Sequence, residues 1–200
     1  MMSRSSSARL SSSKPVAAKR YSTVAIILHW MIALGILAQI VMGLAMTHLS
    51  IPIGLKFQLY QLHKSIGITV LLAVFLRLAW RLANRPPALP TAMPPLERLA
   101  AEATHWLLYA LMFAIPLTGW AEVTVSPYHI PTVLFRLVPW PNFPGLAGFA
   151  GNKLADSIAT FVHTRLAFLI IALLGLHAAA ALRHHFLLRD GILRRMLPFL

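Results

Sequence analysis

Long apolar runs alternate with short polar and proline-rich segments along most of this chain. Four of the runs, residues 23–46, 66–82, 105–125 and 158–182, are each long and apolar enough to cross a lipid bilayer. A membrane-spanning helix needs about 20 predominantly apolar residues, and an open chain in lipid must be helical to satisfy its backbone hydrogen bonds. The pattern therefore predicts an all-α integral membrane four-helix bundle.

The second run is the shortest, because Arg77 and Arg81 interrupt its end. Arg81 can extend its charged group to the membrane interface, whereas Arg77 lies deeper and needs a polar partner. We expect Pro116 to kink the third helix, since proline removes one backbone hydrogen bond.

The composition agrees with a membrane protein and narrows its chemistry. Hydrophobic residues make up 58% of the 200 residues, the mean hydropathy is +0.71, and only five side chains are acidic. So little polar surface excludes a soluble globular domain. The absence of cysteine excludes disulfides, iron–sulfur clusters and cysteine-linked haem, so a bound metal must rely on histidine, methionine or oxygen ligands.

The net charge of +13 indicates the orientation of the chain rather than a nucleic-acid partner, because the basic residues flank the apolar runs. Thirteen of the 18 lysine and arginine residues lie in the N-terminal tail, in segment 77–98 or at the C-terminal end. The other five are Lys56, Lys64, Arg136, Lys153 and Arg165. The positive-inside rule then places both termini in the cytoplasm, with the first and third helices running outward.

The segments between and before the runs complete the predicted organisation. Residues 1–20 are rich in serine and basic residues and are expected to form a disordered cytoplasmic tail, retained rather than cleaved as a signal peptide. Residues 21–200 form the transmembrane domain. The proline-rich segment 85–95 is a cytoplasmic connection, and the longer loop 126–156 faces outside and caps the bundle.

The fourth run carries histidines at several depths on one face. His163 and His177 are fourteen residues apart, which corresponds to about 21 Å of helical rise and to a rotation about 40° short of four full turns. His184 follows seven residues later and lies only about 20° further round. An ionisable side chain inside a membrane is costly unless it has a partner, so this stripe indicates function.

Histidines of the other runs match these depths. His63 can face His163 in the outer leaflet, and His29 can face His177 in the inner leaflet. Iron in a porphyrin needs only two axial ligands, which two helices can supply, whereas a bare zinc site would need three or four ligands at one depth. The spacing therefore predicts two haems stacked across the bilayer, each held by two histidines.

Depth alone does not assign a single role to the remaining histidines. His105 lies at the depth of His29 and is a ligand, a hydrogen-bond partner of a ligand or a quinone contact. His184 and His185 form either a solvated basic helix end or a site for quinone or haem propionate. His48 and His129 are interpreted as interfacial polar groups rather than ligands.

Several segments resemble one known family, and the similarity covers residues 21–198. They are YSTVAIILHW, HKSIGITVLLAVFLRLAWRL, HWLLYALMFAIPLTGW, and GLHAAAALRHHF followed by DGILRRMLP. The chain resembles the bacterial di-haem cytochrome b561 proteins, a family that includes superoxide:ubiquinone oxidoreductases. By motif, the resemblance also assigns the haem ligands to His29, His63, His163 and His177.

The resemblance implies two b-type haems that pass electrons between the outer face and ubiquinone. With two axial imidazoles per iron, no position is left for oxygen, which favours electron transfer without oxygen binding. Lys64 and Arg165, beside the outer ligands, could concentrate superoxide. Arg77, His105 and His184 are the candidate residues near the inner haem or the quinone.

Two alternatives stay open. The chain could be the cytochrome b subunit of a hydrogenase or another dehydrogenase, with a redox partner protein. It could also be a haem-free transporter lined by histidines, which would show no Soret absorbance.

Overall fold

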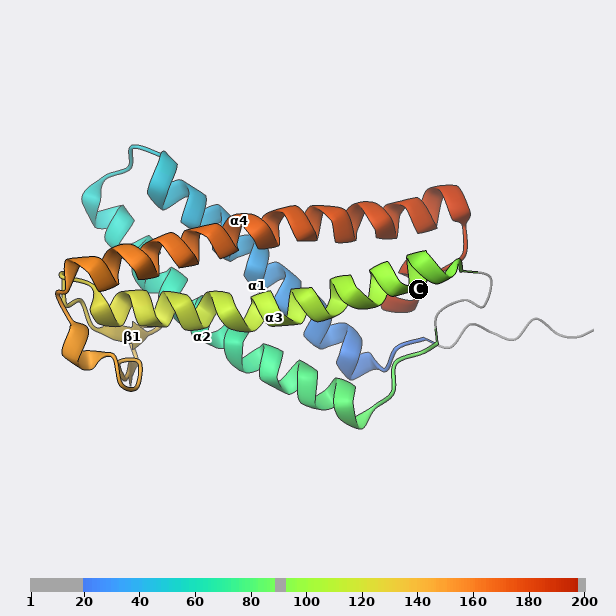
Figure 1. Ribbon diagram of the computed structural model, residues 1–200, viewed down its shortest axis with the longest axis horizontal. Coiled ribbons are helices and arrows are strands. Elements are labelled where there is room, and N and C mark those ends of the chain that lie inside the picture. The colour runs from blue at the N-terminus through green and yellow to red at the C-terminus, as the bar shows by residue number, and fades with distance from the viewer. Residues whose placement is uncertain (1–19, 89–92, 198–200) are drawn as a thin grey trace, which may run out of the picture.

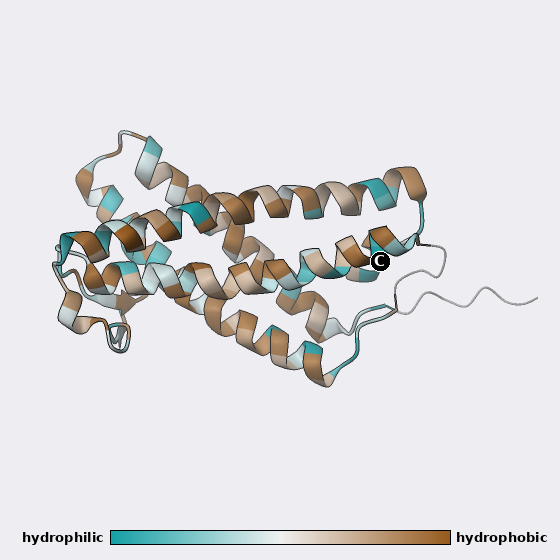
Figure 2. Ribbon diagram, in the orientation of Figure 1, coloured by the Kyte–Doolittle hydropathy of each residue, from teal (hydrophilic) through white to brown (hydrophobic). Residues whose placement is uncertain are grey.

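A computed structural model describes residues 20–88 and 93–197. Four long helices run along one axis: α1 (Thr23–His48), α2 (Ile53–Ala83), α3 (Pro95–Val125) and α4 (Lys153–Arg183) (Figure 1). Within the described residues, these four helices are long and apolar enough to cross a membrane. Apolar residues dominate their surfaces (Figure 2), and the predicted integral membrane four-helix bundle is confirmed.

The helices extend beyond the apolar runs that predicted them. α2 begins at Ile53 rather than at residue 66, and α3 begins at Pro95 rather than at residue 105. A helix of 31 residues is about 46 Å long, whereas the hydrocarbon core of a bilayer is about 30 Å thick. The apolar run marks only the part of a helix that contacts lipid, because backbone hydrogen bonding continues equally well in a polar segment.

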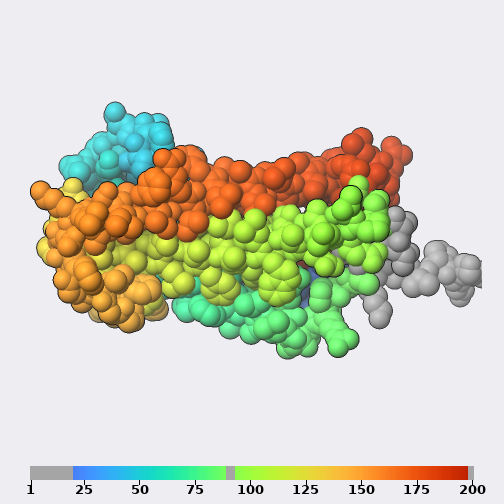
Figure 3. Space-filling view, viewed as in Figure 1, coloured from blue at the N-terminus to red at the C-terminus, as the bar shows by residue number. Residues whose placement is uncertain are grey.

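Neighbouring helices in the chain pack against each other. Close backbone packing joins α1 to α2, α2 to α3 and α3 to α4, and Figure 3 shows α3 and α4 side by side along one face. Among the described helices, α4 does not pack closely on α1 or α2. Side chains such as Ile32, Val74 and Tyr109 fill the interior between α1, α2 and α3. The wider spacing of α4 from α1 and α2 leaves room between them for side chains that reach across.

The loop between α3 and α4 contains structure that the sequence pattern did not predict. Strands β1 (Thr132–Leu134) and β2 (Val138–Trp140) form an antiparallel hairpin, and η1 (Ala147–Phe149) follows. The hairpin packs on α2, where the Phe135 backbone N–H donates to Ser65 Oγ at 2.9 Å. The hairpin therefore lies over the end of the bundle that holds the start of α2.

The two ends of the described chain meet at the opposite end of the bundle (Figure 1). After α4, a π-helical turn (His184–Leu188) leads through Arg189, with φ at 53°, to η3 (Leu193–Met196). The indole of Trp30 donates to the carbonyl oxygen of Met196 at 2.8 Å. This contact fixes the C-terminal segment beneath the start of α1. The predicted tail, apart from residue 20, lies outside the described residues.

Candidate haem-binding sites

The structure brings four of the predicted ligand histidines together in two pairs. We call His63 of α2 and His163 of α4 the outer pair, after the orientation predicted from the sequence. This pair lies toward the hairpin end, with ring centroids 6.4 Å apart. The inner pair, His29 of α1 and His177 of α4, lies toward the end that carries both chain ends and has the same centroid separation of 6.4 Å. Both pairs bridge helices whose backbones are not closely packed.

The separation within each pair suits an iron ion between the rings. An imidazole nitrogen binds a transition-metal ion at about 2 Å, so two imidazoles on opposite sides of one ion have ring centroids about 6.3 Å apart. Among the described residues, no group of three or more histidine or acidic side chains could hold a bare metal ion. The two pairs therefore fit haem, which needs only two protein ligands.

Glycines lie beside the outer pair. A Cβ atom at Gly119 of α3 would lie 2.9 Å from Cε1 of His163, which is closer than non-bonded carbon atoms approach. At Gly43 of α1, a Cβ atom would lie 3.7 Å from Cε1 of His63. The contact at Gly119 would be too close, so this glycine leaves room for the ring of His163, whereas 3.7 Å at Gly43 is an ordinary van der Waals contact.

The imidazole of His163 is held in one tautomer. Its Nδ1 lies 3.0 Å from the backbone carbonyl oxygen of Ile115 and 3.2 Å from the hydroxyl of Thr118. A carbonyl oxygen can only accept, so Nδ1 carries the proton and Nε2 keeps its lone pair. Metal-bound histidines in proteins usually have such a partner for the second nitrogen, because it fixes both ring orientation and tautomer.

The imidazole of His63 has an unsatisfied nitrogen. Its Nδ1 is buried and has no hydrogen-bond partner among the described residues. The side chain of Gln39 lies nearby, and its Nε2 donates to the backbone carbonyl oxygen of His63 at 2.8 Å. Unpaired buried polar atoms are rare in folded proteins and indicate a missing partner or a strained functional site.

A third histidine joins the inner pair. The ring of His105 on α3 lies 5.6 Å from that of His177, closer than the 6.4 Å between His29 and His177. The shorter separation leaves less space for an iron ion than either proposed pair provides. Sequence depth could not distinguish His29 from His105, and the distances favour His29 as the ligand.

Two arginines lie close to the inner pair. Arg77 donates from Nη1 to the backbone carbonyl oxygen of Ala25 at 2.9 Å, so this deep charge has a polar partner. The guanidinium of Arg81 lies 5.4 Å from the ring centroid of Trp106 and 5.6 Å from that of Tyr109. Arg81 is thus held against aromatic rings of α3, in addition to lying near the helix end.

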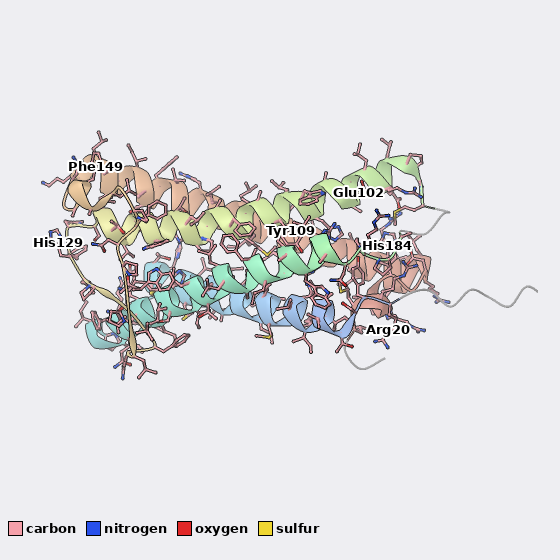
Figure 4. All side chains as sticks on the ribbon, turned by 90° about the horizontal axis from the view of Figure 1, so that it is seen from below. Arg20, Glu102, Tyr109, His129, Phe149 and His184 are labelled. Carbon is pink, nitrogen blue, oxygen red and sulfur yellow. The ribbon has the colours of Figure 1, made fainter. Side chains whose placement is uncertain are left out.

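His184 forms a hydrogen-bonded pair with Asp190 that the sequence did not predict. Its Nδ1 lies 2.5 Å from Oδ2 of Asp190, and the other carboxylate oxygen accepts from the Ile192 backbone N–H at 3.1 Å. Figure 4 shows His184 and Arg20 at one end of the bundle and His129 at the other. His48 and His129 are exposed and lie outside both pairs.

The two candidate anion-binding residues contact neutral groups. Lys64 is half-buried, and its Nζ donates to the carbonyl oxygen of Pro131 at 3.0 Å, which ties the hairpin loop to α2. Arg165 is exposed, and its guanidinium lies 5.0 Å from the ring centroid of Phe161. Neither residue forms an ion pair in the described structure, so both charges remain uncompensated.

Comparison with known proteins links this arrangement to one family. The family model described as prokaryotic cytochrome b561 matches residues 20–199 of the chain. The match covers all four membrane helices, both histidine pairs and the C-terminal segment.

Curated relatives agree with this match. The Escherichia coli protein named cytochrome b561 homolog 2 is 34% identical over 179 residues, covering 90% of this chain and 92% of the relative. A Yersinia pestis protein named probable superoxide oxidase CybB is 32% identical over 190 residues, covering 90% of this chain and 97% of the relative. Cytochrome b561 homolog 1 of Escherichia coli is 28% identical over 136 residues, covering 68% of this chain and 73% of the relative.

Proposed function

Since this chain belongs to the prokaryotic cytochrome b561 family of membrane electron-transfer proteins, whose members bind b-type haem, we propose that it carries electrons from superoxide to ubiquinone. Membership of this family establishes that the chain is a membrane electron-transfer protein. The choice of superoxide follows the similarity to the relative named a superoxide oxidase.

Four histidines would hold two haems in this proposal. His63 and His163 would hold the outer haem, and His29 and His177 would hold the inner haem. The observation that carries the assignment is the shared separation of 6.4 Å within both pairs, near the distance that one iron ion requires. b-type haem would supply one-electron transfer when bound.

The overall reaction balances without any covalent intermediate. Two superoxide anions each lose one electron and become dioxygen. The two electrons and two protons convert one ubiquinone to ubiquinol. The protein has to bind the anion near one face, keep water away from the interior, and supply protons where the quinone is reduced.

The outer face has the charge that an anionic donor needs. We place the hairpin end outside and both termini in the cytoplasm, following the distribution of basic residues. Basic residues exceed acidic ones at the hairpin end, where Glu122 and Asp156 are the acidic side chains. Lys64 and Arg165 belong to this excess and would attract superoxide through long-range electrostatic steering.

The inner end offers groups that can bind a quinone and move protons. His184 and Asp190 share a short hydrogen bond near the end of α4, so a proton on the imidazole is held by a carboxylate. Arg77 and His105 lie near the inner pair and can donate hydrogen bonds to a carbonyl oxygen. We assign these three side chains, His184, Arg77 and His105, to the quinone-reducing end.

Absorbance spectroscopy and stopped-flow kinetics test this function. The dithionite-reduced minus oxidised spectrum and pyridine haemochrome quantitation should give b-type haem at two per chain. Superoxide should then reduce the isolated protein and, through it, a soluble ubiquinone. Haem without superoxide-dependent reduction, together with a co-purifying dehydrogenase, would instead indicate an electron-transfer subunit. Absence of Soret absorbance after expression with adequate haem would refute the proposal.

A further inference from the structure

A cavity of about 740 Å³ lies at the end of the bundle that carries both ends of the described chain. It is bounded by the start of α1, the end of α2 and the C-terminal segment, with Tyr109 of α3 in its wall. In Figure 4, Arg20 lies at this end and Tyr109 lies nearer the middle of the bundle. Ligand-binding cavities in proteins commonly measure about 300–1,000 Å³, so this space suits a polar head group rather than a single ion.

Four arginines line this cavity. They are Arg20, Arg77, Arg81 and Arg85, and none of the described lining residues is acidic. Arg77 and Arg81 lie one helical turn apart on α2 and are partly buried, whereas Arg20 and Arg85 are exposed at the rim. Such a concentration of positive charge without a carboxylate favours the binding of an anion, which would offset the mutual repulsion of the guanidinium groups.

The cavity walls are held by hydrogen bonds between distant parts of the chain. The indole Nε1 of Trp80 donates to the hydroxyl of Ser22 at 2.9 Å, joining α2 to the start of α1. Arg195 donates from Nη1 to the carbonyl oxygen of Ala88 at 2.7 Å, joining the C-terminal segment to the connection after α2. These contacts form the cavity without a ligand, which lowers the entropic cost of binding one.

Arg81 is oriented for binding an oxyanion. Its guanidinium is held near the rings of Trp106 and Tyr109, at 5.4 and 5.6 Å from their centroids. An arginine supported by aromatic rings keeps its N–H groups available, and the planar guanidinium can donate two parallel hydrogen bonds to phosphate.

We propose that this cavity binds the phosphate group of an anionic phospholipid from the surrounding membrane leaflet. The cavity lies at the helix ends, where lipid head groups surround a membrane bundle. Val24 and Leu82, on the two helices that bound it, are exposed apolar residues that acyl chains could cover. Basic pockets between membrane helices are suited to the head groups of anionic lipids. Arg81 would bind the phosphate, and the rim arginines Arg20 and Arg85 would complete its neutralisation.

Native mass spectrometry of the full-length haem-loaded protein tests this site. The detergent-purified protein is titrated with phosphatidylglycerol, and phosphatidylcholine serves as the zwitterionic probe. We expect Arg81→Gln and Arg85→Gln each to weaken phosphatidylglycerol binding about tenfold or more, since each removes one charge-assisted contact. Phosphatidylcholine should bind weakly to every variant.

Arg194→Gln is the matched control. Arg194 is exposed in the same C-terminal segment but does not line the cavity, and this variant loses the same charge. It should bind phosphatidylglycerol as the unaltered protein does. Equal phosphatidylglycerol binding by all variants would overturn the proposal. If Arg81→Gln and Arg85→Gln instead lose affinity for a soluble ubiquinone and bind phosphatidylglycerol unchanged, the proposal is also overturned and the cavity is a quinone site. Arg85 lies in an exposed connection, so its variant keeps the test valid even if Arg81→Gln fails to fold.

Discussion

The side chain of Gln39 on α1 donates from Nε2 to the backbone carbonyl oxygen of His63 on α2, at 2.8 Å. Two further buried atoms of this pair, Oε1 of Gln39 and Nδ1 of His63, have no partner among the described residues. Gly67 gives the amide its space, because a Cβ atom there would lie 2.8 Å from Gln39 Nε2. Gln39 thus contacts the residue that we propose as a ligand of the outer haem.

We predict that Gln39 tunes the potential of the outer haem. A small shift of the amide would let Oε1 accept from His63 Nδ1, which makes the imidazole a stronger electron donor and lowers the potential of the iron. Gln39→Leu should therefore raise the midpoint potential of the outer haem, on the order of tens of millivolts, and leave the inner haem unchanged. Redox titration followed by absorbance measures both. An unaltered outer potential with full haem content would show that Gln39 only joins α1 to α2.

We predict that the two haem sites can be emptied separately. The pairs lie about 21 Å apart along α4, on different partner helices. His63→Ala should remove the outer haem alone, and His29→Ala should remove the inner haem alone. Pyridine haemochrome quantitation and redox spectra measure the haem that remains.

His105→Ala is the control for the inner site. Its ring lies closer to His177 than two imidazoles on opposite sides of one iron ion would, so this variant should keep both haems. If His105→Ala loses a haem while His29→Ala keeps two, helix α3 supplies the inner ligand and our pairing is wrong.

We predict that a side chain at Gly119 blocks the outer haem. A Cβ atom at this position would lie 2.9 Å from the ring of His163, so Gly119→Val should displace the imidazole and halve the haem content. Gly54→Val is the matched control, because nothing lies within 4 Å of a Cβ atom at Gly54. A Gly119→Val protein with both haems and unchanged spectra would contradict the proposed role of this glycine.

We predict that the basic outer face accelerates the reaction with superoxide. Replacing Lys64 and Arg165 by glutamine should lower the rate of superoxide-dependent haem reduction and flatten its dependence on salt. The Debye length is about 10 Å at 0.1 M ionic strength, so added salt screens a long-range attraction.

Stopped-flow reduction over a series of ionic strengths measures this effect, with haem content expected to stay constant. Lys64 also ties the hairpin loop to α2, so Lys64→Arg serves as a control that keeps the positive charge. Unchanged rates and salt dependence in the double glutamine variant would show that Lys64 and Arg165 do not attract superoxide and contribute only to membrane topology.

The sequence alone determined the class of the protein and the depth of its histidines. Apolar runs of membrane-spanning length can only be helical in lipid, and the regular rise of a helix converts the positions of His163 and His177 into depths. The pairing of His163 with His63 followed from depth, whereas depth left both His29 and His105 as possible partners of His177. The ends of α2 and α3 could not be predicted from hydropathy, because helical hydrogen bonding continues where hydropathy falls.

The tertiary structure decided which side chains at one depth lie close together, because this depends on the distances between helices. His29 and His105 share a depth, and only the packing of α1 and α3 around α4 places them at different distances from His177. The contacts of Gln39 with His63 and of Gly119 with His163 likewise join residues far apart in the chain. Periodicity within one helix carries no information about how far that helix stands from its neighbours, so these relationships required the folded bundle.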